Sequence, residues 1–199
     1  MHLPRTGGSS LGLALKRRYR DQAMKVTGVA LADVAGSAPN DARVFYGHMR
    51  FGLHRLMPVR YVTVLRDPVQ RATSHFRLYM YKFGKEGRET SFQGFLEKWG
   101  ASDVQTRILS GTPDVTADLG LAQEHLLTFS AVGFYDELER FAECLGLATP
   151  LPRLDKVDVN YAFSPEQLDQ LQELNTVDAA LYAWARKFAP QVAVAGQLA

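Results

Sequence analysis

The chain has 199 residues, of which 46% are hydrophobic and 22% are charged, so we expect one globular domain over residues 1–199 with a substantial core. Its formal net charge of +2 is too small to indicate a nucleic-acid-binding protein. No apolar run approaches the ~20 residues that a membrane-spanning helix needs. The N-terminus lacks a signal-peptide pattern, and Cys144 is the sole cysteine, so we expect a cytoplasmic protein. A lumenal domain separated from its anchor would have the same composition.

Short apolar runs rich in β-branched residues alternate with helical patterns along the chain. This alternation predicts an α/β fold, in which a parallel sheet is flanked by helices. A first helix is expected after Gly8, because Leu11, Leu15 and Tyr19 recur every four residues. We predict strands at 43–46, 61–65 and 131–133.

Two later helices have recognisable starts. Asp67 followed by Pro68 predicts an N-cap with proline in the first helical position. Ser164 and Gln167 have the spacing of a capping box. The side chains expected to face the core are Val69, Phe76 and Met80 in the first of these helices and Leu168, Leu171, Val177, Leu181, Trp184 and Phe188 near the C-terminus.

The segment 4–10 has the composition of a phosphate-binding loop. Gly7 and Gly8 allow a tight turn and a close approach to a ligand, and the N-terminus of the following helix favours an anion. Arg5 adds a permanent positive charge. The hydroxyl groups that can donate to phosphate oxygens are those of Thr6, Ser9 and Ser10. A Walker A sequence is absent, and this run alone is also compatible with an ordinary turn and helix cap.

A second candidate anion anchor follows the predicted strand 61–65. Arg66 stands at the carboxyl end of that strand, which is the edge where open α/β sheets bind ligands. Ser74 lies two helical turns further on, so its hydroxyl can reach the same anion. An Arg-Asp-Pro turn by itself is also compatible with a purely structural role.

Together, the loop 4–10 and the pair Arg66 and Ser74 resemble the sulfotransferase superfamily that uses 3′-phosphoadenosine 5′-phosphosulfate (PAPS). The similarity is greatest to the branch of the heparan sulfate 2-O-sulfotransferases and their bacterial relatives. It continues, in the family's order, through residues 46–54, 105–111 and 131–134. The resemblance implies a P-loop-like sheet whose first loop binds the 5′-phosphosulfate, while Arg66 and Ser74 bind the 3′-phosphate. It also implies a hydroxyl acceptor, expected to be a carbohydrate, and chemistry that requires no metal.

His48 is the candidate catalytic base, because it follows a predicted strand and the flexible Gly47. An imidazole with an unperturbed pKa near ~6.5 suits proton removal at neutral pH, and the resemblance independently places the base here. A structural histidine bonded to backbone is the alternative. Arg5 stands where the family usually has lysine, so it can stabilise the leaving phosphate but hardly donate a proton. The strand before the loop is expected to be shortened to residues 1–3, against the usual ~5 residues.

Further basic and polar residues have less specific expectations. Arg50, Arg55 and Arg60 are positioned to attract an anionic sugar, and Gln105, Thr106 and Arg107 to line the cleft. No Cys, His or carboxylate spacing indicates a metal site. Two other functions stay open: a small-molecule kinase, against which the missing Walker lysine counts, and a non-catalytic nucleotide-binding module, suggested by Arg5 and the short first strand.

Overall fold

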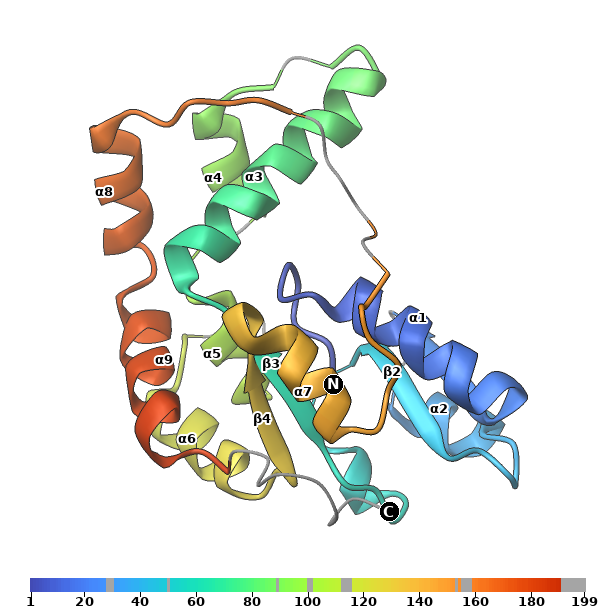
Figure 1. Ribbon diagram of the computed structural model, residues 1–199. Helices are drawn as coiled ribbons and strands as arrows, with labels where there is room; N and C mark the ends of the chain where they lie inside the picture. Colours follow the sequence, from blue (N-terminus) through green and yellow to red (C-terminus); the bar gives the residue numbers. More distant parts are fainter. Residues whose placement is uncertain are drawn as a thin grey trace.

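The computed structural model describes residues 1–27, 31–49, 51–88, 90–99, 102–111, 116–152, 154 and 159–190. The fold is mixed α/β, as the alternation of patterns predicts (Figure 1). Arg50, one of the arginines expected near the acceptor, lies outside the described residues.

Two small parallel sheets form the centre of the described fold. In the first, β1 (Ala23–Thr27) pairs with β2 (Val44–His48), with Ala23 opposite Val44. In the second, β3 (Val62–Leu65) pairs with β4 (Ala131–Phe134), with Val62 opposite Ala131. The three predicted strands are therefore confirmed to within two residues at each end. Strand β1 was not predicted, because among its five residues only Val26 is buried and the pattern has no continuous apolar run.

The first residues of the chain lie between these two sheets (Figure 1). The α-amino group of Met1 donates to the carbonyl of Val62 at 2.8 Å, and the N–H of His2 donates to the carbonyl of Gly47 at 2.9 Å. The side chain of Leu3 is fully buried in the core. The short segment expected in place of a first strand thus contacts both β2 and β3 and carries the chain directly into the loop that follows.

Helices cover the sheets on more than one side (Figure 1). Helix α1 packs on β2, α7 packs on β4, and α6 and α5 pack against α9. The α-helices are α1 (Gly8–Tyr19), α2 (Leu31–Ser37), α3 (Pro68–Lys85), α4 (Phe92–Trp99), α5 (Val104–Leu109), α6 (Leu119–Leu127), α7 (Leu138–Cys144), α8 (Pro165–Glu173) and α9 (Thr176–Phe188). Short 3-10 turns occupy Arg20–Gln22, Leu53–Arg55 and Tyr135–Glu137.

The predicted helix starts form as their capping chemistry requires. The Asp67 carboxylate accepts from the N–H of Gln70 at 2.9 Å, which caps α3. The hydroxyl of Ser164 and the side chain of Gln167 cap α8 reciprocally.

The expected core stripes are only partly correct. Phe76 is buried in an aromatic cluster with Tyr79 and Phe95, whereas Val69 and Met80 are half-buried. Near the C-terminus the chain forms two helices instead of one, so the register of the apolar stripe changes between them. Leu171 and Leu181 are buried, but Leu168 and Phe188 are 37% and 62% exposed, so their assignment to the core was wrong.

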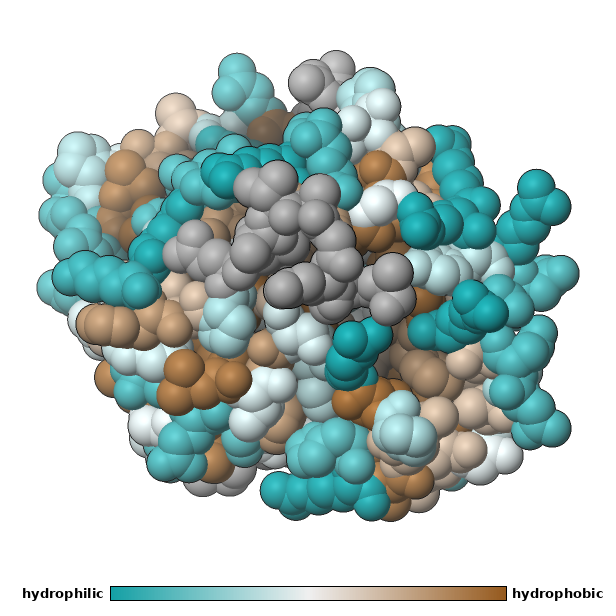
Figure 2. Space-filling model, turned by 60° about the horizontal axis from the view of Figure 1, so that its bottom comes forward, coloured by the Kyte–Doolittle hydropathy of each residue, from teal (hydrophilic) through white to brown (hydrophobic). Residues whose placement is uncertain are grey.

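One face of the molecule is mixed in character. Figure 2 shows the face at the bottom of Figure 1, where hydrophobic patches are scattered among hydrophilic side chains. Within the described ranges, no helix has both the length and the apolar character needed to cross a bilayer.

Candidate functional site

The glycine-containing loop connects the buried Leu3 to the start of α1. Its backbone turns sharply, since φ is 65° at Arg5 and 88° at Gly7, both in the left-handed region. A side chain at Gly7 would be strained by this positive φ, and its Cβ would lie 2.5 Å from Cδ2 of Leu138, so the leucine side chain would have to shift. The hydroxyl of Thr6 is buried and donates to the carbonyl of Leu3 at 2.9 Å. Thr6 therefore shapes the loop. We expected its hydroxyl to donate to a phosphate oxygen, but in the structure it donates to the backbone of the loop.

Helix α1 begins directly after this loop, so the N–H groups of its first turn lie beside the loop. Gly7 is the N-cap of α1 and has no side chain with which to cap the first turn. Ser9 is exposed at this end and Ser10 is half-buried. The N–H groups and hydroxyls of the first turn are thus placed where the helix dipole favours an anion.

The second predicted anchor lies directly against the loop. Nε of Arg5 donates to Oγ of Ser74 at 3.0 Å, across 69 residues of sequence. Nη1 of Arg66 donates to the carbonyl of Arg5 at 3.1 Å, across 61 residues. The guanidinium of Arg66 also lies over the ring of Tyr135, 3.9 Å from its centroid. The two segments that were singled out separately in the sequence therefore form one cluster.

Positive charge is concentrated in this cluster. Desolvation by burial lowers the pKa of Arg66, and the nearby positive charges of Arg5 and Arg77 lower it further, against the opposing effects of Tyr135 and Asp67. Nε of Arg66 is buried and has no hydrogen-bond partner among the described residues. A bound anion beside Arg5 and Arg66 would relieve the repulsion between their guanidinium groups.

His48 ends β2 and stacks on His2, with the ring centroids 4.2 Å apart. Its Nδ1 lies 3.1 Å from the carbonyl oxygen of His2. Because a carbonyl can only accept, Nδ1 carries the proton in this arrangement, and Nε2 of the neutral ring is left as a proton acceptor.

The pKa values of both imidazoles are lowered. His48 is exposed as a residue, but the stacked ring of His2 covers one face of its imidazole. Desolvation lowers the pKa of His48, and the positive charge of Lys25 lowers it further. The hydrogen bond to the His2 carbonyl raises this pKa but does not cancel the other two effects. Desolvation and the neighbouring His48 lower the pKa of His2 to about 3. Both rings are therefore neutral at pH 7.

The ring of His2 also lies against the backbone of Gly8. A Cβ at Gly8 would lie 1.8 Å from Cδ2 of His2, which is closer than any side chain can approach. The second glycine of the loop is thus required by the position of His2, and through His2 it affects the placement of His48.

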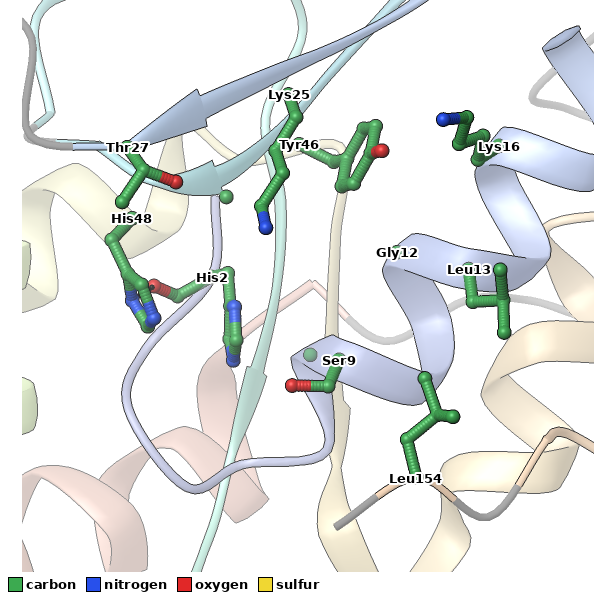
Figure 3. A pocket seen from close by; sticks show the side chains of 12 residues that line it. His2, Ser9, Gly12, Leu13, Lys16, Lys25, Thr27, Tyr46, His48 and Leu154 are labelled. Carbon is green, nitrogen blue, oxygen red and sulfur yellow. Dashed lines mark hydrogen bonds between the residues drawn. The ribbon is translucent and has the colours of Figure 1, made fainter. Parts of the chain in front are cut away.

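A pocket of about 400 Å³ lies between α1 and the sheet of β1 and β2 (Figure 3). His2 and His48 stand at one end of it, and the side chains of Lys25 and Ser9 point into it (Figure 3). The remaining lining residues are Gly8, Gly12, Leu13, Lys16, Thr27, Tyr46, Gly47 and Leu154. Sequence reasoning assigned no role to Lys25 or Thr27, because they belong to the strand that was not predicted.

Several residues expected near the site lie elsewhere. Arg55 and Arg60 are exposed and do not line this pocket. Gln105 and Thr106 were expected in the cleft wall, but they are 1% and 0% exposed and bond to other protein groups, so that expectation was wrong. Their burial follows from the packing of α5 against α9. Arg107, the third residue of that segment, is half-buried.

Comparison with known proteins adds no family to this picture. No protein-family model matches the chain, and no curated protein sequence matches it. In the part of the chain that the structure describes, no three His, Cys, Asp or Glu side chains gather as a group that could hold a metal ion.

Proposed function

We propose that the protein is a sulfotransferase with a P-loop-like sheet, which moves a sulfuryl group from PAPS to a hydroxyl group of a carbohydrate acceptor. The observation that carries the proposal is the meeting of the two anchors, with Arg66 bonded to the Arg5 carbonyl and Arg5 bonded to Ser74. PAPS carries an anionic group at each end of its ribose, and it needs two such basic, hydroxyl-bearing anchors at one site.

On the donor side, the loop and the first turn of α1 would hold the 5′-phosphosulfate. Arg5 supplies charge, while Ser9, Ser10 and the N–H groups at Gly7 and Gly8 supply hydrogen-bond donors. The 3′-phosphate would bind between Arg66 and Ser74. In its bond to Arg5 the Ser74 oxygen acts as an acceptor, so its hydroxyl proton is still able to donate to a phosphate oxygen.

The transfer itself needs an in-line arrangement and a base. The acceptor oxygen forms a bond to sulfur as its proton passes to Nε2 of His48, and the bond between sulfur and the bridging phosphate oxygen breaks. The electron pair stays on that oxygen, so adenosine 3′,5′-bisphosphate leaves with an additional negative charge. Arg5 and the helix N–H groups stabilise this charge without donating a proton, which makes arginine chemically adequate in place of lysine.

The pocket beside His48 would take the acceptor. Its volume of about 400 Å³ is in the range of small-molecule sites. The ring of Tyr46 offers a surface on which a sugar can stack, and Ser9 and Thr27 offer hydroxyl groups. Lys16 and Lys25 add positive charge, so these two lysines favour an acceptor that carries an acidic group.

Two measurements test this proposal. Isothermal titration compares adenosine 3′,5′-bisphosphate with ATP and Mg²⁺, and we expect the bisphosphate to bind and ATP to bind much more weakly. Transfer of radiolabelled sulfate from PAPS to a panel of neutral and acidic saccharides then identifies the acceptor. Binding of ATP alone would indicate a kinase instead. Bisphosphate binding with no transfer to any acceptor would indicate a non-catalytic nucleotide-binding module.

A further inference from the structure

The backbone of Arg66 is held by a side chain from a distant part of the chain. Oε1 of Gln105 accepts from the N–H of Arg66 at 3.0 Å, and Nε2 of Gln105 donates to the carbonyl of Arg66 at 2.8 Å. One amide side chain therefore satisfies both backbone groups of one residue. Gln105 itself is 1% exposed.

This contact occurs where the sheet ends. Strand β3 pairs with β4 up to Leu65, opposite Phe134, and α3 begins at Pro68. Arg66 lies between the two, where the strand ladder no longer supplies partners for its N–H and carbonyl. The amide of Gln105 takes the place of a neighbouring strand and fixes the backbone from which the Arg66 side chain projects.

Gln105 is held in turn by the carboxylate of Asp178 in α9. Oδ2 of Asp178 accepts from the N–H of Gln105 at 3.1 Å. Oδ1 accepts from both the N–H and the hydroxyl of Thr106, each at 2.7 Å. The N–H of Asp178 donates to Oδ1 of Asp103 at 2.8 Å, so α5 and α9 bind each other at their first turns. Asp178 and Thr106 are 1% and 0% exposed, so water does not compete for these bonds.

The far end of the Arg66 side chain is fixed by a separate set of contacts. Its guanidinium donates to the Arg5 carbonyl and lies over the ring of Tyr135. Gln105 holds the base of the residue, while Arg5 and Tyr135 hold its tip. A rigid support of this kind preorganises a donor for a ligand, which reduces the loss of conformational freedom on binding.

We propose that Gln105 is a positioning residue that aims Arg66 at the 3′-phosphate of the nucleotide, and so determines the preference for nucleotides that carry one. The inference rests on the proposed function. It adds that selectivity for the 3′-phosphate depends on a buried amide that does not touch the nucleotide.

The test compares two nucleotides on the same protein. Adenosine 3′,5′-bisphosphate and adenosine 5′-monophosphate differ only by the 3′-phosphate, so the ratio of their dissociation constants reports its recognition. Gln105→Met keeps the length and volume of the side chain but removes both hydrogen bonds to Arg66. We expect a loss of about 10-fold in bisphosphate affinity, which is part of what a charge-assisted bond contributes, and little change for the monophosphate.

Two further variants make the outcome decisive. Gln170→Met, at an exposed position of α8, is the matched control and should leave the ratio unchanged. Gln105→Asn keeps a buried amide that is one carbon too short to reach both groups, so it reports on the same ratio if the methionine variant does not fold. Equal losses for both nucleotides, or an unchanged ratio in both folded Gln105 variants, would overturn the inference and leave the proposed function intact. A wild-type protein that does not distinguish the two nucleotides would overturn the proposed function, and the inference with it.

Discussion

Replacing His48 with alanine tests the proposed base directly. In the structure Nδ1 of His48 donates to the His2 carbonyl at 3.1 Å, so only Nε2 can take the proton of the acceptor hydroxyl group. Loss of a single general base lowers turnover by ~10²–10⁴-fold, which corresponds to about 3–5 kcal/mol of transition-state stabilisation. Nucleotide affinity should be nearly unchanged, because the contacts that join Arg5, Arg66 and Ser74 do not involve His48.

The dependence of turnover on pH gives a second readout of the same residue. A general base acts in its neutral form, so the rate rises as pH increases through the pKa of His48. Desolvation and the charge of Lys25 place that pKa below the ordinary value of 6.5. The wild-type rate should therefore be constant at neutral pH and decline only in more acidic solution, and the His48→Ala variant should lack this acidic decline.

The assay is steady-state sulfate transfer with the acceptor identified from the saccharide panel, combined with titration of adenosine 3′,5′-bisphosphate. His54→Ala is the matched control, since His54 is exposed, packs near Phe51 and lies outside the pocket. A His48→Ala protein that keeps wild-type turnover would refute the assignment of the base. So would a variant whose only defect is weaker nucleotide binding.

Three other changes have defined outcomes. Arg66→Ala should weaken bisphosphate binding by about 1.5–3 kcal/mol, measured by titration, because it removes a charge-assisted donor; unchanged affinity would contradict the 3′-phosphate site. Gly8→Ala should reduce turnover while circular dichroism stays native, since the new Cβ would displace the His2 ring that it approaches to 1.8 Å; full activity would show that His2 does not position His48. Burial, followed by the charge of Arg71, lowers the pKa of His75 to about 3 in the folded protein. Between pH 6.5 and 3 the His75 side chain therefore binds a proton in the unfolded chain but not in the folded one. As pH falls through that range, the free energy of unfolding should decrease by on the order of 1 kcal/mol per pH unit. In urea unfolding at pH 7 and 4.5, His75→Phe should lose less stability than wild type, and an identical loss would argue against this titration.

Local sequence chemistry determined the parts of the fold that depend on neighbouring residues. The caps at Asp67 and Ser164 form as predicted, because their partners Gln70 and Gln167 lie three residues away. The strand at Val62–Leu65 was recognisable because residues buried on both faces make a continuous apolar run. Strand β1 carries no such run, so its existence depends on pairing with β2.

The candidate site also combines features that local sequence predicts with features that only tertiary packing determines. The sequence by itself singled out the loop with Arg5, the pair Arg66 and Ser74, and His48 as candidates. It did so from local patterns of glycine, hydroxyl and strand-end residues, together with the family resemblance that these segments carry. The tertiary structure alone decided that Arg5 meets Ser74, that Lys25 shares a pocket with His48, and that Gln105 holds the Arg66 backbone. These contacts join residues far apart in the chain. They form only because the packing of strands and helices sets which faces meet, and no short window of sequence contains that information.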